Sequence, residues 1–145
     1  MAVRFLLDVN VLIALIDDRH IHHELAHRWF GSVGRKEFAT CPFTQNAVLR
    51  ILSGPGYANS FGTPAVISEM LSKFCAMPGH VFWPDDISLL NCPEIEPSRL
   101  LRSSQVSDTF LLALASTHGG YLATFDRRLV VSAVRDGANA LYLIR

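Results

Sequence analysis

Short apolar runs that end at polar residues alternate along this chain with segments of helical spacing. The first run, Phe5–Leu7, stops at Asp8, and a second apolar run begins at Val11. A buried strand followed by a helix fits this order, with Asn10 near the helix N-cap. Because ligands of an open parallel sheet bind outside the carboxyl ends of its strands, Asp8 is placed where such a fold carries its chemistry.

The same alternation continues to the end of the chain. After Phe5–Leu7 we expect strands at 37–41, 80–83, 121–124 and 140–144, and helices at 11–16, 20–30, 45–52, 64–74 and 108–118. Thr44, Thr63 and Ser107 are the expected N-caps of the last three helices. Residues 87–104 predict loop with one short helix, and a further short helix is expected between Asp126 and Val134. Strands alternating with helices predict an α/β fold with a mainly parallel sheet.

Composition favours one globular domain over residues 1–145. Half of the residues are hydrophobic and 18% are charged, which argues against disorder. The 13 basic residues balance the 13 acidic ones, so no global basic field indicates nucleic-acid binding. Three cysteines without C-x-x-C spacing predict neither a disulfide framework nor structural zinc, and they suggest a reducing cytosol. No signal peptide or membrane span is expected, so the predicted location is cytoplasmic.

Three carboxylates fall at predicted strand ends or helix starts. Asp8 follows the first strand, Asp126 follows the strand at 121–124, and Asp108 lies in the first turn of a helix. Carboxylates gathered at one rim repel one another unless a divalent cation neutralises them, and Mg²⁺ or Mn²⁺ suits an all-oxygen site. Each aspartate also has an ordinary explanation, as a turn residue or a favourable charge at a helix N-terminus. These patterns alone predict an acidic metal site on an α/β sheet and nothing more specific.

Four segments carry motifs that can be matched to a known family. They are LLDVNVLI at 6–13, ATCPFTQN with LRIL at 39–52, QVSD with LLALA at 105–115, and LATFD at 122–126. In this order and spacing, from about Phe5 to Leu129, they resemble the PIN-domain nucleases, specifically the VapC toxins of bacterial toxin–antitoxin pairs. FWPDD at 82–86 is similar to a phrase of one VapC subgroup.

The resemblance implies a three-layer α/β/α PIN-like fold and an Mg²⁺-dependent endoribonuclease, usually a homodimer, that a cognate VapB-type antitoxin holds silent. Asp8 and Asp108 would be the principal Mg²⁺ ligands, and Asp126 would complete the site directly or through water. Asn10 and Thr124 would orient these carboxylates, although Asn10 is equally explained as a helix cap.

Gln45 departs from the family pattern, which normally has a glutamate at this position. An amide keeps the shape and one oxygen ligand but removes a charge, and two unit charges about 4 Å apart interact by roughly 4 kcal/mol at an effective dielectric of 20. Changed hydration offsets much of this, and weaker metal binding is expected. Three explanations stay open: an engineered inactivating substitution, a natural variant of reduced activity, or use of another acid. The available acids are Asp17, Asp18, Asp85 and Asp86.

Two further patterns bear on binding. Residues 23–27 read HELAH, which matches the H-E-x-x-H signature of zinc proteases. Leu25, Ala26 and Trp29 place this helix against a core, so its histidines are better explained as a solvated face. The candidates for RNA phosphate contacts are Arg127 and Arg128 beside Asp126, together with Arg99 and Arg102 before Asp108. Solvated surface arginines, or arginines that meet an acidic antitoxin segment, are the alternatives.

Overall fold

The computed structural model describes residues 3–60 and 62–145. Within them, five strands form one sheet in the order β3-β2-β1-β4-β5, and every neighbouring pair is parallel. The strands are β1 (Phe5–Leu7), β2 (Phe38–Thr40), β3 (His80–Phe82), β4 (Tyr121–Thr124) and β5 (Leu141–Leu143). The predicted parallel sheet is confirmed, and β1 is its central strand.

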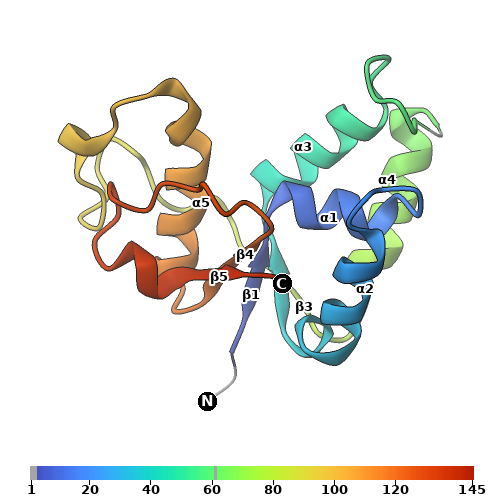
Figure 1. The fold of residues 1–145 in the computed structure, drawn as a ribbon, viewed down its shortest axis with the longest axis horizontal. Coiled ribbons are helices and arrows are strands. Elements are labelled where there is room, and N and C mark those ends of the chain that lie inside the picture. Colours follow the sequence, from blue (N-terminus) through green and yellow to red (C-terminus); the bar gives the residue numbers. More distant parts are fainter. Residues whose placement is uncertain (1–2, 61) are drawn as a thin grey trace.

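Helices cover both faces of this sheet, which makes the predicted three-layer arrangement (Figure 1). One face carries α1 (Val9–Ile16), α2 (His23–Ser32), α3 (Pro42–Leu52) and α4 (Pro64–Cys75), and the other carries α5 (Val106–Thr117). Side chains alternate along β1, so that Phe5 and Leu7 enter the first core while Leu6 enters the second. Burial on both faces explains why the strand is a continuous apolar run.

Three expected N-caps were wrong. Asp8, not Asn10, is the N-cap of α1, because its side chain accepts a hydrogen bond from the Val9 amide. Helix α3 begins at Pro42 after Cys41, since proline suits the first helical position, and Thr44 lies inside the first turn. Helix α5 begins at Val106 because a 3₁₀ turn at Ser103–Gln105 runs directly into it, so Ser107 is not its cap. The expected cap Thr63 of α4 is confirmed.

Segments outside the main elements also differ from expectation. Residues 127–134 do not form the expected helix, since the backbone of 133–135 bonds the segment 94–96 instead, including Glu96 N to Ala133 O at 2.8 Å. Helix α2 begins at His23 rather than at residue 20. Short 3₁₀ helices are found at Gly34–Lys36, Pro97–Arg99, Ser103–Gln105 and Gly137–Ala140, so 87–104 holds two such turns rather than one helix.

Candidate active site

Asp8 occupies the junction of the central strand β1 and helix α1. Its Oδ1 accepts a hydrogen bond from the Val9 amide at 2.7 Å, and its Oδ2 accepts one from the Thr124 hydroxyl at 2.7 Å. Only 7% of the residue is exposed, since β2 and β4 flank β1. Burial raises the pKa of Asp8 above its ordinary value and the charge of Asp126 adds to the rise, while the two hydrogen bonds act against it.

Thr124, the last residue of β4, is the hub of this junction. Besides donating to Asp8, its hydroxyl oxygen accepts from Asn10 Nδ2 at 3.2 Å and from the Asp126 amide at 3.1 Å. Thr124 is completely buried, so water does not compete for these bonds. Asn10 Oδ1 is also buried and has no hydrogen-bond partner among the described residues. A buried acceptor without a donor is uncommon, and this one lies two residues from Asp8.

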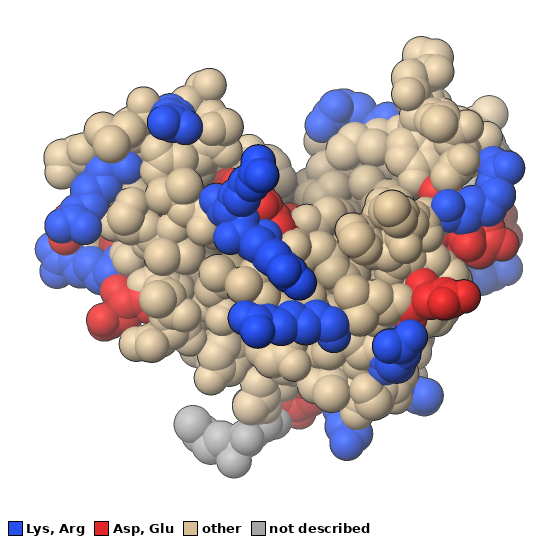
Figure 2. All heavy atoms as spheres, in the orientation of Figure 1, with Lys and Arg blue, Asp and Glu red and all other residues tan. Residues whose placement is uncertain are grey.

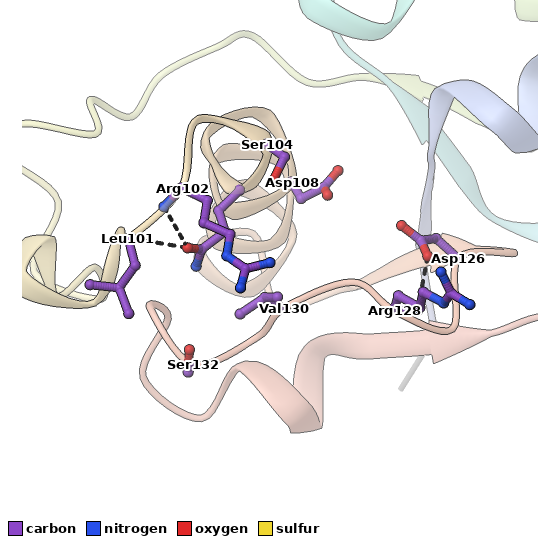
Figure 3. A pocket seen from close by; sticks show the side chains of 9 residues that line it. Leu101, Arg102, Ser104, Asp108, Asp126, Arg128, Val130 and Ser132 are labelled. Carbon is purple, nitrogen blue, oxygen red and sulfur yellow. Dashed lines mark hydrogen bonds between the residues drawn. The ribbon is translucent and has the colours of Figure 1, made fainter.

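Asp108 and Asp126 line a cavity of about 580 Å³ between α5 and the segment that follows β4. Figure 3 shows the two carboxylates directed toward one another across this space. Asp108 projects from the first turn of α5, and the Asp126 Oδ1 accepts from the Arg128 amide at 2.9 Å. Helix and strand thus bring together two acids that are far apart in the sequence.

Asp108 is affected by the charges of the other two predicted carboxylates. Burial and the charges of Asp8 and Asp126 raise the pKa of Asp108 to about 6. Within the described residues, however, no group of three or more His, Cys, Asp or Glu side chains is already arranged to hold a metal ion. The acids therefore share one electrostatic site at the carboxyl edge of the sheet without forming a closed ligand shell.

Gln45 lies at a different place on that edge. Its Nε2 donates to Thr40 Oγ1 at 3.0 Å, and the same hydroxyl lies 2.7 Å from His80 Nε2 and 3.7 Å from Cys75 Sγ. Gln45 lines a separate cavity of about 130 Å³ between α3 and α4. The structure thus binds this side chain into a neutral cluster rather than into the cavity of Asp108 and Asp126.

The four candidate phosphate-binding arginines divide into two groups. Arg102 and Arg128 line the cavity together with Asp108 and Asp126 (Figure 3). Arg127 is exposed beside Arg128, whereas Arg99 pairs with Glu96 at 3.0 Å. Blue basic side chains lie next to red acidic ones at the hollow in the middle of the face in Figure 2. A negatively charged polymer could therefore meet cationic groups beside the acids.

The H-E-x-x-H histidines make bonds that explain them without zinc. His23 Nδ1 lies 2.7 Å from the Ala14 carbonyl and His27 Nε2 lies 3.2 Å from the Leu15 carbonyl. Carbonyl oxygens only accept, so both ring nitrogens donate and satisfy carbonyls at the end of α1 that lack a helical partner. The pair joins α2 to α1.

The other acids considered for the site have different surroundings. Asp17 is buried and accepts from Tyr57, Asn59 and the Arg19 amide, and these bonds lower its pKa although burial raises it. Asp18 is exposed in the same turn. Asp85 Oδ2 accepts from the Phe43 amide at 3.1 Å, and Asp86 pairs with His118 at 3.0 Å. None of these four acids is among the described residues that line the Asp108 cavity.

Sequence reasoning missed the role of Gln105. Its Oε1 accepts from the amides of Leu101 and Arg102 at 2.9 and 3.0 Å, and its Nε2 donates to the Arg99 carbonyl at 3.2 Å. The residue is 5% exposed, so these bonds order the turn that carries Arg102 into the cavity. The sequence signal for this role was a glutamine three residues before Asp108.

Comparison with known proteins identifies the family. The PIN domain model matches residues 5–134. Ribonuclease VapC44 of Mycobacterium tuberculosis is 39% identical over 141 residues, covering 97% of this chain and 98% of that protein. Ribonuclease VapC39 of the same species is 40% identical over 128 residues, covering 88% of this chain and 92% of the relative. The chain therefore belongs to the PIN-domain family, in which its relatives are VapC ribonucleases.

A solved structure of FitAB bound to an IR36 DNA fragment has the same fold. It superposes with a TM-score of 0.57 over 96% of this chain and 94% of that chain, at 18% identity. Across the described residues every helix is too short or too polar to serve as a bilayer span.

Proposed function

We propose that this protein is the toxin of a VapBC-type toxin–antitoxin pair and an endoribonuclease that hydrolyses RNA phosphodiesters. The observation that carries the proposal is that Asp108 and Asp126 line one cavity at the carboxyl edge of the sheet, close enough to Asp8 that the charges of Asp8 and Asp126 help to raise the pKa of Asp108. The PIN-domain match and the relatives named ribonuclease support the reaction class. The arginines beside the acids support a polyanionic substrate.

The chemistry of the donor set fits Mg²⁺, with Mn²⁺ as a substitute. The raised pKa of Asp108 reports carboxylates that repel one another, and a cation removes that repulsion. Asp8 and Asp108 would be the principal ligands, Asp126 would bind directly or through water, and the buried Asn10 Oδ1 is an additional oxygen. When bound, such an ion supplies a water of lowered pKa and offsets charge on the phosphodiester.

The protein's own residues orient these groups. Thr124 holds one Asp8 oxygen, and the Val9 amide holds the other, so the buried carboxylate keeps a fixed direction. Arg102 and Arg128 would bind phosphate oxygens across the cavity from Asp108 and Asp126. Arg127 and Arg99 would extend this contact to neighbouring phosphates.

A catalytically weakened PIN module is the second candidate, and one observation favours it. Gln45 is neutral and donates its amide to Thr40, so at this position the chain contributes no charge to the acidic site. Such a module would act by binding its antitoxin or RNA. Cleavage at saturating Mg²⁺ or Mn²⁺ separates the two functions, because the module would bind RNA but cut it poorly.

The decisive experiment compares RNA cleavage by the unchanged protein, Asp108→Asn and Asp86→Asn. We expect Mg²⁺-dependent cleavage that EDTA abolishes, a loss of at least about 100-fold in Asp108→Asn, and unchanged activity in Asp86→Asn, whose carboxylate pairs with His118. Cleavage that persists in EDTA, or an equal loss in both variants, would contradict the proposed site.

The partner is tested separately. Expression of the chain alone should arrest growth, and co-expression with the neighbouring reading frame should restore it if that frame encodes the antitoxin. Light scattering of the purified protein tests the expected homodimer. Growth arrest that the neighbouring frame does not relieve would contradict the toxin–antitoxin assignment of this pair of genes while leaving the ribonuclease proposal standing.

A further inference from the structure

A partly exposed aromatic ledge, built from His20, His22 and Phe125, lies beside the acidic site. The imidazole of His22 stacks on the Phe125 ring, with ring centroids 5.1 Å apart and an interplanar angle of 28°. The His20 ring follows, 5.7 Å from that of His22. His22 is exposed, and Phe125 is partly buried against the first core. The exposed His22 ring therefore offers π surface to solvent.

The ledge is held in place by bonds that neither the family motifs nor the metal proposal uses. Asp17, 1% exposed, accepts from the Tyr57 hydroxyl and from Asn59 Nδ2, and it also binds the Arg19 amide at 3.0 Å. Its carbonyl accepts from the His20 amide at 3.1 Å.

A further hydrogen bond within this turn orients the His20 ring. His20 Nδ1 accepts from the His22 amide at 3.0 Å, which sets the direction in which the chain enters α2. The turn between α1 and α2 is thus ordered before any ligand arrives, so binding there loses little conformational freedom.

Its position relative to the acids follows from the chain. Phe125 lies between Thr124, which binds Asp8, and Asp126, which lines the cavity. Consecutive Cα atoms are about 3.8 Å apart, so the ledge begins one residue from an acidic group. Phe125 packs with the α1–α2 side of the sheet, whereas Asp126 faces the α5 side. An RNA strand that crosses the carboxyl edge of the sheet would therefore contact both Phe125 and Asp126.

We propose that this ledge binds one base of single-stranded RNA by stacking on His22, with Phe125 behind it, beside the phosphodiester held at the acids. The inference rests on the proposed ribonuclease function. Aromatic rings stack on any unpaired base because every base has a π face. Arg127 and Arg128 follow Asp126 directly and supply phosphate contacts for the neighbouring nucleotides.

The molecule contains a matched control for this ledge. His118 stacks on Trp83 with centroids 4.5 Å apart and an interplanar angle of 13°. It caps the C-terminus of α5, ten residues from Asp108 and therefore about 15 Å along the helix axis. His118→Ala removes a stacked imidazole without touching the ledge.

The test is RNA binding in EDTA, so that metal-dependent cleavage does not interfere. Fluorescence anisotropy of a labelled single-stranded hexanucleotide is measured with the unchanged protein, His22→Ala, His22→Phe, His22→Leu and His118→Ala. We expect His22→Ala and His22→Leu to weaken binding by about 5- to 150-fold, the range for one stacked base. His22→Phe should bind within about twofold of the unchanged protein and His118→Ala likewise, since both keep a ring on the ledge.

Thermal melting of each variant guards against unfolding as the cause. If His22→Ala melts early, His22→Leu, which keeps apolar packing on Phe125, decides: full RNA affinity in that variant overturns the proposal. Unchanged affinity in His22→Ala, or no RNA binding at all, also overturns it. RNA binding through His22 without any cleavage in Mg²⁺ would contradict the ribonuclease function and leave the ledge standing. Cleavage with an unchanged KM in His22→Ala would do the reverse.

Discussion

Two buried threonines are the last residues of β2 and β4, the strands on either side of β1, and their surroundings are opposite in character. Thr124 ends β4 and binds Asp8, Asn10 and the Asp126 amide. Thr40 ends β2 and binds Gln45 and His80. Both residues are fully buried. One hydroxyl therefore organises carboxylates that repel one another, and the other organises neutral groups that satisfy one another.

The difference shows where ionised side chains destabilise this fold. At Thr124 the pKa of Asp8 is raised by burial and the pKa of Asp108 reaches about 6, so the ionised acids destabilise the metal-free protein. At Thr40, burial lowers the pKa of His80 and thereby favours its neutral form. Only the acids around Thr124 repel one another, which is why we propose that the metal binds there.

The largest expected contrast comes from replacing each hydroxyl by a methyl group. Thr124→Val removes the donor to Asp8, which should reduce cleavage by about 10- to 100-fold and lower stability by roughly 2 kcal/mol, as for a hydrogen bond to a charged group. Thr40→Val should lower stability by about 1 kcal/mol and change cleavage less than threefold. Chemical denaturation and cleavage rates measure both. Equal loss of activity in the two variants would remove the distinction between the hubs.

The charge of Asp108 makes the stability of the acidic site depend on pH. Its pKa is raised from 3.8 to about 6, so its contribution to the stability of the metal-free protein should be fully present below about pH 4 and should be lost as the pH rises through 6. Asp108→Asn should melt roughly 3 °C higher than the unchanged protein at pH 7, after allowance for solvent screening. At pH 4, where Asp108 is protonated, the two proteins should melt at the same temperature. Melting curves in EDTA between pH 4 and 8 measure this. A variant that melts lower at pH 7 would contradict the repulsion.

Gln45→Glu tests whether the neutral side chain at position 45 limits catalysis. If its side chain turns from the Thr40 cluster toward the acids, an added carboxylate should strengthen metal binding and raise cleavage about tenfold at low Mg²⁺, because roughly 4 kcal/mol of gross charge interaction is largely offset by hydration. Asn46→Asp, exposed on the same helix, is the control for added charge and should have little effect. Rates of RNA cleavage across a Mg²⁺ titration measure the change. Identical rates for Gln45→Glu and the unchanged protein would sink the idea that this position limits activity.

The smallest expected effect concerns the arginines next to the acidic hub. Arg127→Ala and Arg128→Ala should each reduce the slope of log binding constant against log salt by about 0.7, the value for one phosphate contact on a single strand. RNA binding between about 50 and 200 mM salt measures the slope. A slope unchanged in the double variant would assign these side chains to another surface, such as an antitoxin contact.

Much of the fold could be predicted because its strands are continuous apolar runs closed by turn residues. Phe5–Leu7 and Tyr121–Thr124 were predicted at their observed bounds. Helix starts failed where local rules competed: Cys41 has no typical cap chemistry, yet Pro42 begins α3. The helix expected after Asp126 failed because its backbone bonds a segment some 40 residues earlier, and such pairing leaves no periodic signal.

The candidate site shows the same division. Asp8, Asp108 and Asp126 were predicted from their places after strands and at a helix start, and their roles as ligands stay predictions. The direction of the Gln45 side chain could not be predicted, because it depends on His80 and Cys75 across the α3–α4 packing. The stacking of His22 on Phe125 joins residues about a hundred positions apart, so only the folded chain reveals it.

The most direct test of the central claim is calorimetric titration of Mg²⁺ into the metal-free protein at pH 7. We expect saturable binding by the unchanged protein and by Asp86→Asn, and binding weakened by at least about tenfold in Asp8→Asn and Asp108→Asn, because each loses one of the charges that the cation neutralises. Equal Mg²⁺ affinity in all four proteins, or no binding by the unchanged chain, would contradict it.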